Sequence, residues 1–377
     1  MNAPIIGTPR VARALVRWFS TAARDLPWRR TRDPYAIWIA EVMLQQTTVA
    51  AVVPHFTRWM REVPTIGALA AASPQRVYRL WEGLGYYRRA ENLLRAARIM
   101  AARPDGLFPR RFAEVLELPG IGRYTAGAIC SIAFDEPTPV LDGNVIRVLA
   151  RLRGLRDDVE SASARARLWQ WAQELVAAAA RFRTPGACGR LNEAMMELGA
   201  TICTPRTPRC PVCPLRRTCI ARRDGSTAEI PRRPVRPRLV DVHCAAVIFN
   251  RNTLWYVRRR PEGAVNARLW EFPQIEVRRG QGVLSALKVF AGLRPDQLER
   301  LGEINHTITR SRIRLEIYRA RSGSPPRAWA GQWRSLTQIR HLPFSSAHRR
   351  IAGLLPGTLS RREAAPTPGA SRSATAD

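Results

Sequence analysis

The chain has 377 residues, of which 46% are hydrophobic, so it is long enough to form more than one packed core. Arg and Lys together number 61 against 30 acidic residues, and the net charge of +31 predicts a polyanionic partner such as nucleic acid. The longest apolar run, residues 175–180, is far shorter than the ~20 residues that a bilayer requires, and Arg interrupts the apolar pattern of the N-terminus, so we expect no membrane segment, no signal peptide and a cytoplasmic location.

Residues 11–199 predict an all-α domain, because apolar residues recur at intervals of three and four and short breakers separate about ten helices. Within it, the segment 35–44 is apolar on nearly every side, yet it contains Glu41. A carboxyl group buried there would have a raised pKa and stay protonated. It could then donate a proton to a purine ring nitrogen and make the base a better leaving group. A place at a narrow solvent-exposed edge is the alternative for Glu41.

Two turns further along the chain contain candidate site residues. Gly120 and Gly122 allow a tight turn whose backbone N–H groups can face a phosphate at the start of the next helix, although most such turns are purely structural. Asp142 precedes an apolar periodic run and is a candidate N-cap. Helix N–H groups would also keep this carboxylate ionised. Beside a sugar C1′ it would then stabilise or capture an oxocarbenium ion, as the second carboxylate of a retaining glycosidase does.

Four of the seven Cys lie within 17 residues, at Cys203, Cys210, Cys213 and Cys219. Clustered thiols indicate metal ligation in a reducing compartment rather than a disulfide framework. Their spacing, C-x6-C-x2-C-x5-C, contains one close pair, whereas zinc sites usually use two. The spacing resembles the cysteine loop of the endonuclease III superfamily of DNA glycosylases, which implies a [4Fe–4S] cluster. A structural zinc ion is the alternative.

The residue pattern changes after the helical domain, which we place at residues 1–225. Residues 226–240 alternate Pro with Arg and predict an extended linker. Residues 241–356 mix strand-like and helical segments and predict a smaller α+β domain. Residues 357–377 are rich in Ser, Pro and Ala and predict a disordered tail.

Several motifs follow one another in a fixed order: Glu41–Thr47, Gly83–Tyr87, Leu118–Thr125, Leu141–Val145, Asn192-Glu193 and the cysteine loop. Together they resemble the MutY-type adenine DNA glycosylases over about residues 10–225, and Leu269–Pro273 extends the match into the second domain. The resemblance implies a monomeric base excision repair enzyme that removes adenine mispaired with 8-oxoguanine or guanine in duplex DNA. It also implies two helical lobes that hold a helix–hairpin–helix, followed by a Nudix-like domain.

The resemblance assigns a role to each matched residue of the active site. Glu41 is the general acid toward N7 of adenine. Asp142 stabilises the oxocarbenium ion or forms a transient covalent adduct. Tyr124 and Asn144 orient Asp142 and the sugar, and Glu193 supports the adenine pocket.

Four further residues are implied to contact the duplex where the adenine leaves it. Gln46 and Tyr86 insert into the base stack, which offsets the loss of stacking that base flipping requires. Thr47 and Leu84 touch the partner base. A surface Gln and a packed Tyr are the ordinary alternatives for Gln46 and Tyr86.

Relatives that also cleave the DNA strand use an amine to form a Schiff base, and the endonuclease III pattern has Lys at the position of Tyr124. The helical domain contains no Lys, since Lys288 in the second domain is the one Lys of the chain. This predicts a monofunctional glycosylase, with an endonuclease III-like lyase as the alternative. A non-catalytic mismatch sensor is the rival of another class, and the pair Glu41 and Asp142 argues against it. A general bias toward Arg is an alternative source of the positive charge.

The second domain resembles a Nudix fold without its catalytic metal site. Strand-like runs at 244–249 and 254–257 predict a hairpin. Residues 277–282 contain no Glu cluster, so a nucleotide pyrophosphatase is disfavoured and a domain that helps recognise 8-oxoguanine is expected. In relatives a Phe-Ser-His-like loop does this. Here Thr309 keeps a hydroxyl and Arg310 replaces His as a donor, which is a departure from the family pattern.

Overall fold

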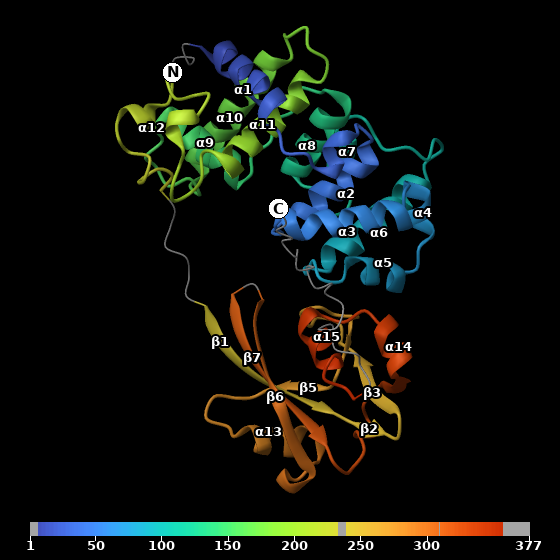
Figure 1. Ribbon diagram of the computed structural model, residues 1–377. Helices are drawn as coiled ribbons and strands as arrows, with labels where there is room; N and C mark the ends of the chain where they lie inside the picture. Colours follow the sequence, from blue (N-terminus) through green and yellow to red (C-terminus); the bar gives the residue numbers. More distant parts are fainter. Residues whose placement is uncertain (1–6, 233–238, 309, 357–377) are drawn as a thin grey trace, which may run out of the picture. The chain divides into compact units, whose positions relative to one another are not determined.

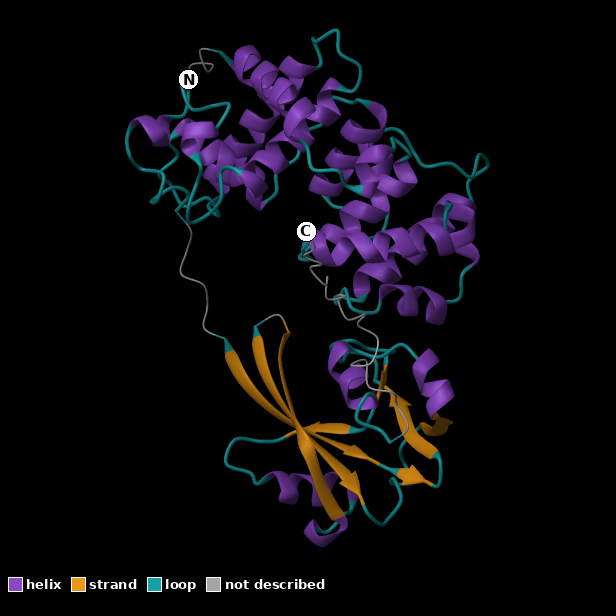
Figure 2. Ribbon diagram, in the orientation of Figure 1, coloured by secondary structure: helices purple, strands orange, loops and turns teal. Residues whose placement is uncertain are grey.

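The computed structural model describes residues 7–232, 239–308 and 310–356, and the chain divides into two compact units between Pro237 and Arg238 (Figure 1). The first unit is helical, whereas the second combines strands with fewer helices (Figure 2). This confirms the predicted combination of an all-α domain with a smaller α+β domain. No helix in the described ranges is long and apolar enough to cross a membrane.

In the first unit, α8 packs against α2 on one side and against α11 on the other (Figure 1). Glycine permits close approaches to α8, because a Cβ at Gly127 would lie 2.2 Å from the carbonyl oxygen of Pro139 in the segment before α9. A Cβ at Gly189 of α11 would lie 2.7 Å from the carbonyl oxygen of Ser131. The helical elements of this unit are α1 (Thr8–Ala22), η1 (Pro27–Arg30), α2 (Pro34–Leu44), α3 (Val49–Glu62), α4 (Ile66–Ala71), α5 (Pro74–Trp81), α6 (Arg88–Ala101), α7 (Phe112–Leu116), α8 (Arg123–Phe134), α9 (Gly143–Arg153), α10 (Ala162–Ala179), α11 (Ala187–Thr201), η2 (Cys210–Val212) and α12 (Ile220–Arg223).

Helix α2 is the buried central helix that the apolar segment 35–44 predicts. It begins with Pro34 in its first turn, where a missing N–H is tolerated, and the Asp33 side chain accepts a hydrogen bond from the N–H of Tyr35. Every residue from Tyr35 to Met43 is buried. Glu41 is therefore held inside the protein by the burial of its apolar neighbours.

The second unit contains two four-stranded sheets with helices packed against them. One sheet has the order β5-β1-β7-β6, with β1 and β7 parallel and its other pairs antiparallel. In the second sheet, β3 pairs with β2, β4 and β8. The elements are β1 (Val240–Ile248), β2 (Asn250–Arg251), β3 (Leu254–Arg259), β4 (Trp270–Glu271), β5 (Gln274–Glu276), α13 (Val283–Ala291), η3 (Pro295–Gln297), β6 (Leu298–Ile308), β7 (Ser311–Ala320), β8 (Gly331–Ser335), α14 (Leu336–His341) and α15 (Ser346–Ala352).

Strand β1 is central to its sheet and is buried on both faces. Ala246 and Ile248 contribute to one apolar cluster, and Ala245 and Val247 contribute to another on the opposite face. A strand in this position needs a partner on each edge, and β1 finds them in β5 and β7. The predicted hairpin between residues 244–249 and 254–257 is therefore wrong for most of its length. Of this region, Phe249 bonds to Tyr256 and β2, which follows β1, pairs with β3.

The helical unit continues into the segment that the sequence predicts to be a linker. Ser226 and Ile230 are buried, and Arg232 forms a bridge with Asp158. Buried contacts thus fix residues 226–232 on the helical unit. Residues 233–238 of the expected linker and the expected tail, 357–377, lie outside the described residues.

Candidate active site

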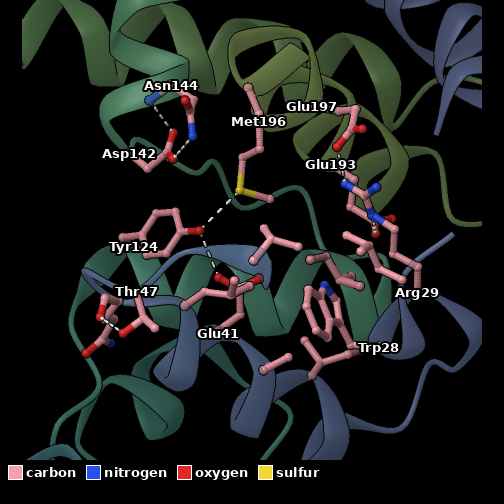
Figure 3. Close-up of a pocket in the computed structure, with 18 of the residues that line it drawn as sticks. Trp28, Arg29, Glu41, Thr47, Tyr124, Asp142, Asn144, Glu193, Met196 and Glu197 are labelled. Atoms are coloured by element: carbon pink, nitrogen blue, oxygen red, sulfur yellow. Dashed lines mark hydrogen bonds and ion pairs between the residues drawn. The ribbon is translucent and has the colours of Figure 1, made fainter. Parts of the chain in front are cut away.

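A cavity of about 590 Å³ lies in the helical unit (Figure 3). Its volume is in the range of about 300–1,000 Å³ that is typical of small-molecule sites. It collects five acidic or phenolic side chains from α2, α8, α11 and the residue before α9. Its walls are formed by Arg24, Leu26, Trp28, Arg29, Ile37, Ala40, Glu41, Leu44, Gln45, Gln46, Thr47, Val49, Tyr124, Ile132, Asp142, Gly143, Asn144, Glu193, Met196, Glu197 and Ala200.

Glu41 faces this cavity and is buried, with 5% of its surface exposed. Burial raises the pKa of its carboxyl to about 7, and a hydrogen bond from Tyr124 opposes that rise. The negative charges of Asp142 and Glu193 raise the pKa further. Near neutral pH a large fraction of Glu41 is therefore protonated and able to act as an acid.

Tyr124 contacts Glu41, whereas the sequence resemblance implied that it orients Asp142. Its hydroxyl donates to Oε2 of Glu41 at 2.8 Å and lies 3.1 Å from Sδ of Met196 (Figure 3). The reason is its position in the first turn of α8, which packs directly against α2. Tyr124 therefore acts on the acid of the cavity.

Asp142 is the N-cap of α9. Its Oδ1 accepts hydrogen bonds from the N–H groups of Asn144 at 3.0 Å and Val145 at 2.7 Å, and its Oδ2 accepts from the side-chain amide of Asn144 at 2.8 Å. The predicted effect of these donors is present, but burial outweighs it and raises the pKa of Asp142 above its ordinary value of 3.8. The side-chain amide of Asn144 thus contacts Asp142 directly, and the orienting role that the resemblance implied stays a prediction.

A buried arginine fixes Asn144 in turn. Nη2 of Arg147 donates to Oδ1 of Asn144 at 2.8 Å and to the carbonyl oxygen of Gly199 at 2.7 Å. Its Nε donates to the carbonyl oxygen of Cys203 at 2.7 Å. The carboxylate of Asp142 is thus connected through two side chains to the first residue of the cysteine loop.

Sequence reasoning placed Glu193 in the cavity but missed the charged residues around it. Arg29 lies 3.5 Å from Glu193 and donates to Glu197 at 2.8 Å, and Arg24 also binds Glu197. Burial raises the pKa of Glu193 despite Arg32 and Arg29. The spacing of Glu193 and Glu197, four residues apart on one helical segment, is the signal that could have found the second carboxylate.

The four residues predicted to contact the duplex lie on two neighbouring loops. Gln46 and Tyr86 are exposed, and both adopt left-handed backbone conformations, with φ of 56° and 47°. Thr47 is half-buried. Leu84 is 5% exposed, because it packs into the protein, so the structure does not present it at the surface as a contact to a partner base would require.

The predicted helix–hairpin–helix consists of α7, a turn and α8. Gly120 in the turn has φ of 79°, and a Cβ there would lie 2.7 Å from Cβ of Asn92, so both conformation and space require glycine. Gly122 is the N-cap of α8 and provides no side-chain cap. The N-terminal N–H groups of α8 are therefore directed toward the turn, as a phosphate site needs.

The cysteine loop surrounds a buried arginine. Arg151 donates to Sγ of Cys203 at 3.4 Å and to the carbonyl oxygens of Thr204 and Pro205 at 2.7 and 3.0 Å. Burial is the main cause that raises the pKa of Cys213 to about 11, and the other three cysteines of the loop contribute to the rise. Within the described ranges, however, no group of three or more Cys, His, Asp or Glu is arranged so that it could hold a metal ion.

In the second unit, Arg310 is exposed in the turn between β6 and β7, and Thr309 lies outside the described residues. Helix α13 occupies the region where a Nudix hydrolase carries its acidic metal helix, and its sequence, VLSALKVFA, contains no acidic residue. The helix instead packs Ala286 and Leu287 into an apolar cluster with β1.

Comparison with known proteins places both units in named families. Residues 39–174 match the model of the HhH-GPD superfamily of base excision DNA repair proteins, and residues 244–353 match that of the NUDIX domain. A solved thermostable thymine-DNA glycosylase is similar to the helical unit, with a TM-score of 0.50 and 28% identity, covering 58% of this chain and 97% of that chain.

Two curated relatives are similar over nearly the whole chain, and both are named adenine DNA glycosylase. The protein from Rattus norvegicus is 34% identical over 402 residues, covering 90% of this chain and 76% of its own length. The protein from Homo sapiens is 34% identical over 414 residues, covering 92% and 74%. These identities, over nearly the whole chain, show that the chain belongs to the adenine DNA glycosylase family.

Proposed function

We propose that this protein hydrolyses the N-glycosidic bond of adenine that lies opposite 8-oxoguanine or guanine in duplex DNA, and that it leaves the DNA strand intact. The observation that supports this most directly is the placing of two carboxyl groups with different environments in one cavity. Glu41 is buried in apolar surroundings, and Asp142 is held by three hydrogen-bond donors. Such pairs divide the roles of acid and charge stabiliser.

The first step is the departure of adenine. Protonated Glu41 donates its proton to N7 of the base, and the electron pair of the bond between N9 and C1′ moves onto the purine. The Tyr124 hydroxyl, 2.8 Å from Oε2, orients the carboxyl group for this transfer. General acid assistance of this kind contributes about 10²- to 10⁴-fold to a rate.

The second step is the capture of the sugar cation by water. The ionised carboxylate of Asp142 faces the positive charge that develops at C1′ and stabilises it electrostatically or through a transient covalent bond. Water adds its oxygen to C1′, and its proton passes to a carboxylate of the cavity. The products are adenine and an abasic site, which balances the reaction without a Lys amine.

Binding to DNA follows from the charge and from the two exposed loop residues. Phosphates would meet the turn at Gly120 and Gly122 and the exposed Arg206, Arg209 and Arg216 of the cysteine loop. Gln46 and Tyr86 would enter the stack as adenine moves into the cavity. The second domain would help recognise 8-oxoguanine through Thr309 and Arg310. The protein would act as a monomer in the cytoplasm.

Cys203, Cys210, Cys213 and Cys219 would hold a [4Fe–4S] cluster. The type and number of the donors support this proposal, because four thiols lie in one loop and Arg151 offers a positive charge to Cys203, although the described side chains are not arranged around a common metal position. When bound, the cluster supplies structural closure of the loop. Zinc would suit the same ligands, so the metal is decided by analysis of the purified protein.

The test uses three duplexes, with adenine opposite 8-oxoguanine, adenine opposite guanine, and thymine glycol opposite adenine. Strand breaks are scored with and without hot alkali for the wild type, for Glu41→Gln and for the surface control Glu160→Gln. We expect alkali-dependent breaks at adenine in the wild type and the control, and a loss of about 10²-fold or more in Glu41→Gln.

Two outcomes would contradict the proposal. Binding without cleavage of any duplex would leave the mismatch sensor. Breaks at thymine glycol without alkali would favour the lyase, for which the helical domain offers no Lys.

A further inference from the structure

Arg89, in the first turn of α6, is a buried cation that binds backbone oxygens on two loops. It is 9% exposed. Nη1 donates to the carbonyl oxygens of Val42 at 2.8 Å, Met43 at 3.0 Å and Gln45 at 2.6 Å. These belong to the last turn of α2 and the residue after it, where carbonyls lack helical partners and carry the negative end of the helix dipole.

The second amino group of Arg89 reaches the other loop. Nη2 donates to the carbonyl oxygens of Leu84 at 2.9 Å and Gly85 at 3.2 Å, and to Oγ1 of Thr47 at 3.2 Å. The Thr47 hydroxyl donates in turn to the carbonyl oxygen of Gln45. One planar guanidinium group therefore joins residues 45–47 to residues 84–86, which a Lys ammonium could not do at the same number of points.

The residues that follow these contacts are in unfavourable backbone conformations. Gln46 and Tyr86 both have positive φ, which non-glycine residues keep only when surrounding contacts fix them. The guanidinium carbon of Arg89 lies 5.6 Å from the ring centre of Tyr86 and 5.0 Å from that of Trp81. Tyr86 is nevertheless 44% exposed, so its ring contacts Arg89 and is also open to solvent.

A charge used only for packing would be expected to have a carboxylate partner. In the part of the chain that the structure describes, no carboxylate forms an ion pair with Arg89, and its Nε has no hydrogen-bond partner. Removing a cation from water without a counter-charge is unfavourable. The hydration that the guanidinium of Arg89 loses is replaced by hydrogen bonds to oxygen atoms. All of these oxygens lie on the two loops and on the end of α2 beside them.

We propose that Arg89 is a positioning residue that fixes the loops of Gln46 and Tyr86 at one spacing, so that both side chains enter the duplex together when the adenine is extruded. This inference rests on the proposed function. In the part of the chain that the structure describes, the guanidinium of Arg89 forms no hydrogen bond with Glu41 or Asp142, so we expect it to act on extrusion and not on the chemical step.

The test compares Arg89→Lys and Arg89→Met with Arg98→Met, a control on the same helix. Arg98 also donates to carbonyl oxygens, those of Ala70 and Ala72, but on α4 and away from both loops. Extrusion is followed in stopped flow by 2-aminopurine next to the target adenine, which brightens when the adenine leaves the stack. Excision is measured in single turnovers opposite 8-oxoguanine and opposite an abasic-site analogue, across pH.

For Arg89→Met we expect extrusion opposite 8-oxoguanine to slow by about 10- to 100-fold, because small misplacements of positioning groups have effects of that size. The extrusion rate of Arg89→Lys should lie between those of Arg89→Met and the wild type, and the rate of Arg98→Met should equal that of the wild type. The deficit should shrink opposite the abasic analogue, where no partner base must be displaced. The shape of the pH profile should not change.

The inference is overturned if Arg89→Lys extrudes adenine like the wild type, or if Arg89→Met loses the same factor on both duplexes, as general unfolding would produce. If the wild type excises no adenine from any duplex, the proposed function itself fails. Normal wild-type excision with Arg89→Met indistinguishable from Arg98→Met defeats this inference alone.

Discussion

The hydroxyl of Tyr124 donates a 2.8 Å hydrogen bond to Glu41 although 83 residues separate the two in the chain. This bond favours the ionised carboxylate and so lowers the pKa of Glu41, against the larger effect of burial. The proposed acid works in its protonated form. Tyr124 therefore moderates the pKa that burial sets near 7.

Replacing Tyr124 with Phe should extend activity to higher pH. Without the hydroxyl, the pKa of Glu41 should rise, and the alkaline limb of the excision rate should move upward by roughly one pH unit, since a hydrogen bond to a charged group contributes about 1.5–3 kcal/mol. Single-turnover excision between pH 5 and about pH 10 measures this. Tyr35→Phe is the matched control, because Tyr35 lies at the start of α2 and its hydroxyl donates to the carbonyl oxygen of Val63, the residue after α3. If the alkaline limb of the excision rate did not move in Tyr124→Phe, Tyr124 would not lower the pKa of Glu41.

Glu41 should also make the stability of the protein depend on pH. Its pKa is raised from 4.5 to about 7 in the folded state, so the folded protein binds more protons than the unfolded chain between these values. Stability is then full below about pH 4.5 and falls as pH rises toward 7. Glu41→Gln removes this loss. The free energy of unfolding of Glu41→Gln, relative to that of the wild type, should therefore increase by roughly 3 kcal/mol between pH 4 and pH 8.

Chemical denaturation at both pH values measures the difference. Glu160→Gln controls for the loss of one surface charge. An equal free energy difference between Glu41→Gln and the wild type at pH 4 and pH 8 would mean that Glu41 is not buried in solution.

Gly199→Ala should damage catalysis more than stability. A Cβ at Gly199 would lie 2.6 Å from Cβ and 2.9 Å from Cα of Asn144, so Asn144 must move away from Asp142. We expect unfolding to be easier by about 1–3 kcal/mol and excision to slow at least ~10-fold. Gly67→Ala on α4 is the control, because a Cβ there meets nothing within 4 Å. Wild-type excision by folded Gly199→Ala would show that Asn144 does not need its present position.

Purified protein should contain iron and acid-labile sulfide in equal amounts. Cys210→Ser should lower both and reduce the melting temperature, because metal binding contributes directly to folding. Cys188→Ser is the control, since that thiol is buried away from the loop. Zinc without sulfide in the wild type would show that the loop holds a single zinc ion and not a [4Fe–4S] cluster.

Local patterns in the sequence predict the two carboxyl groups well. An apolar segment with one Glu indicates burial of Glu41, and an Asp before a periodic run indicates the N-cap at Asp142. Both follow from contacts within one helix, which neighbouring residues determine. Whether burial or the N–H donors have the larger effect on the pKa of Asp142 depends on the whole cavity, which the sequence does not show.

Contacts between distant segments could not be read in this way. Arg29 binds Glu197 across 168 residues, and the partner of Tyr124 depends on how α8 packs against α2. The hairpin prediction for residues 244–249 failed for the same reason. An apolar run reveals that a strand is buried but does not reveal which strands lie beside it.

Helix α9 connects Asp142 with the cysteine loop. Its N-cap is Asp142, its third turn carries Arg151, and 11 residues give it a length of about 16 Å. Arg151 holds the backbone of the cysteine loop, and Arg147 binds both Asn144 and Cys203. Side-chain hydrogen bonds thus link the cysteine loop to the proposed catalytic carboxylate through this one helix. Damage to the cysteine loop, by oxidation or by loss of its metal, would reach C1′ of the sugar as a mechanical displacement, although no cavity residue had changed.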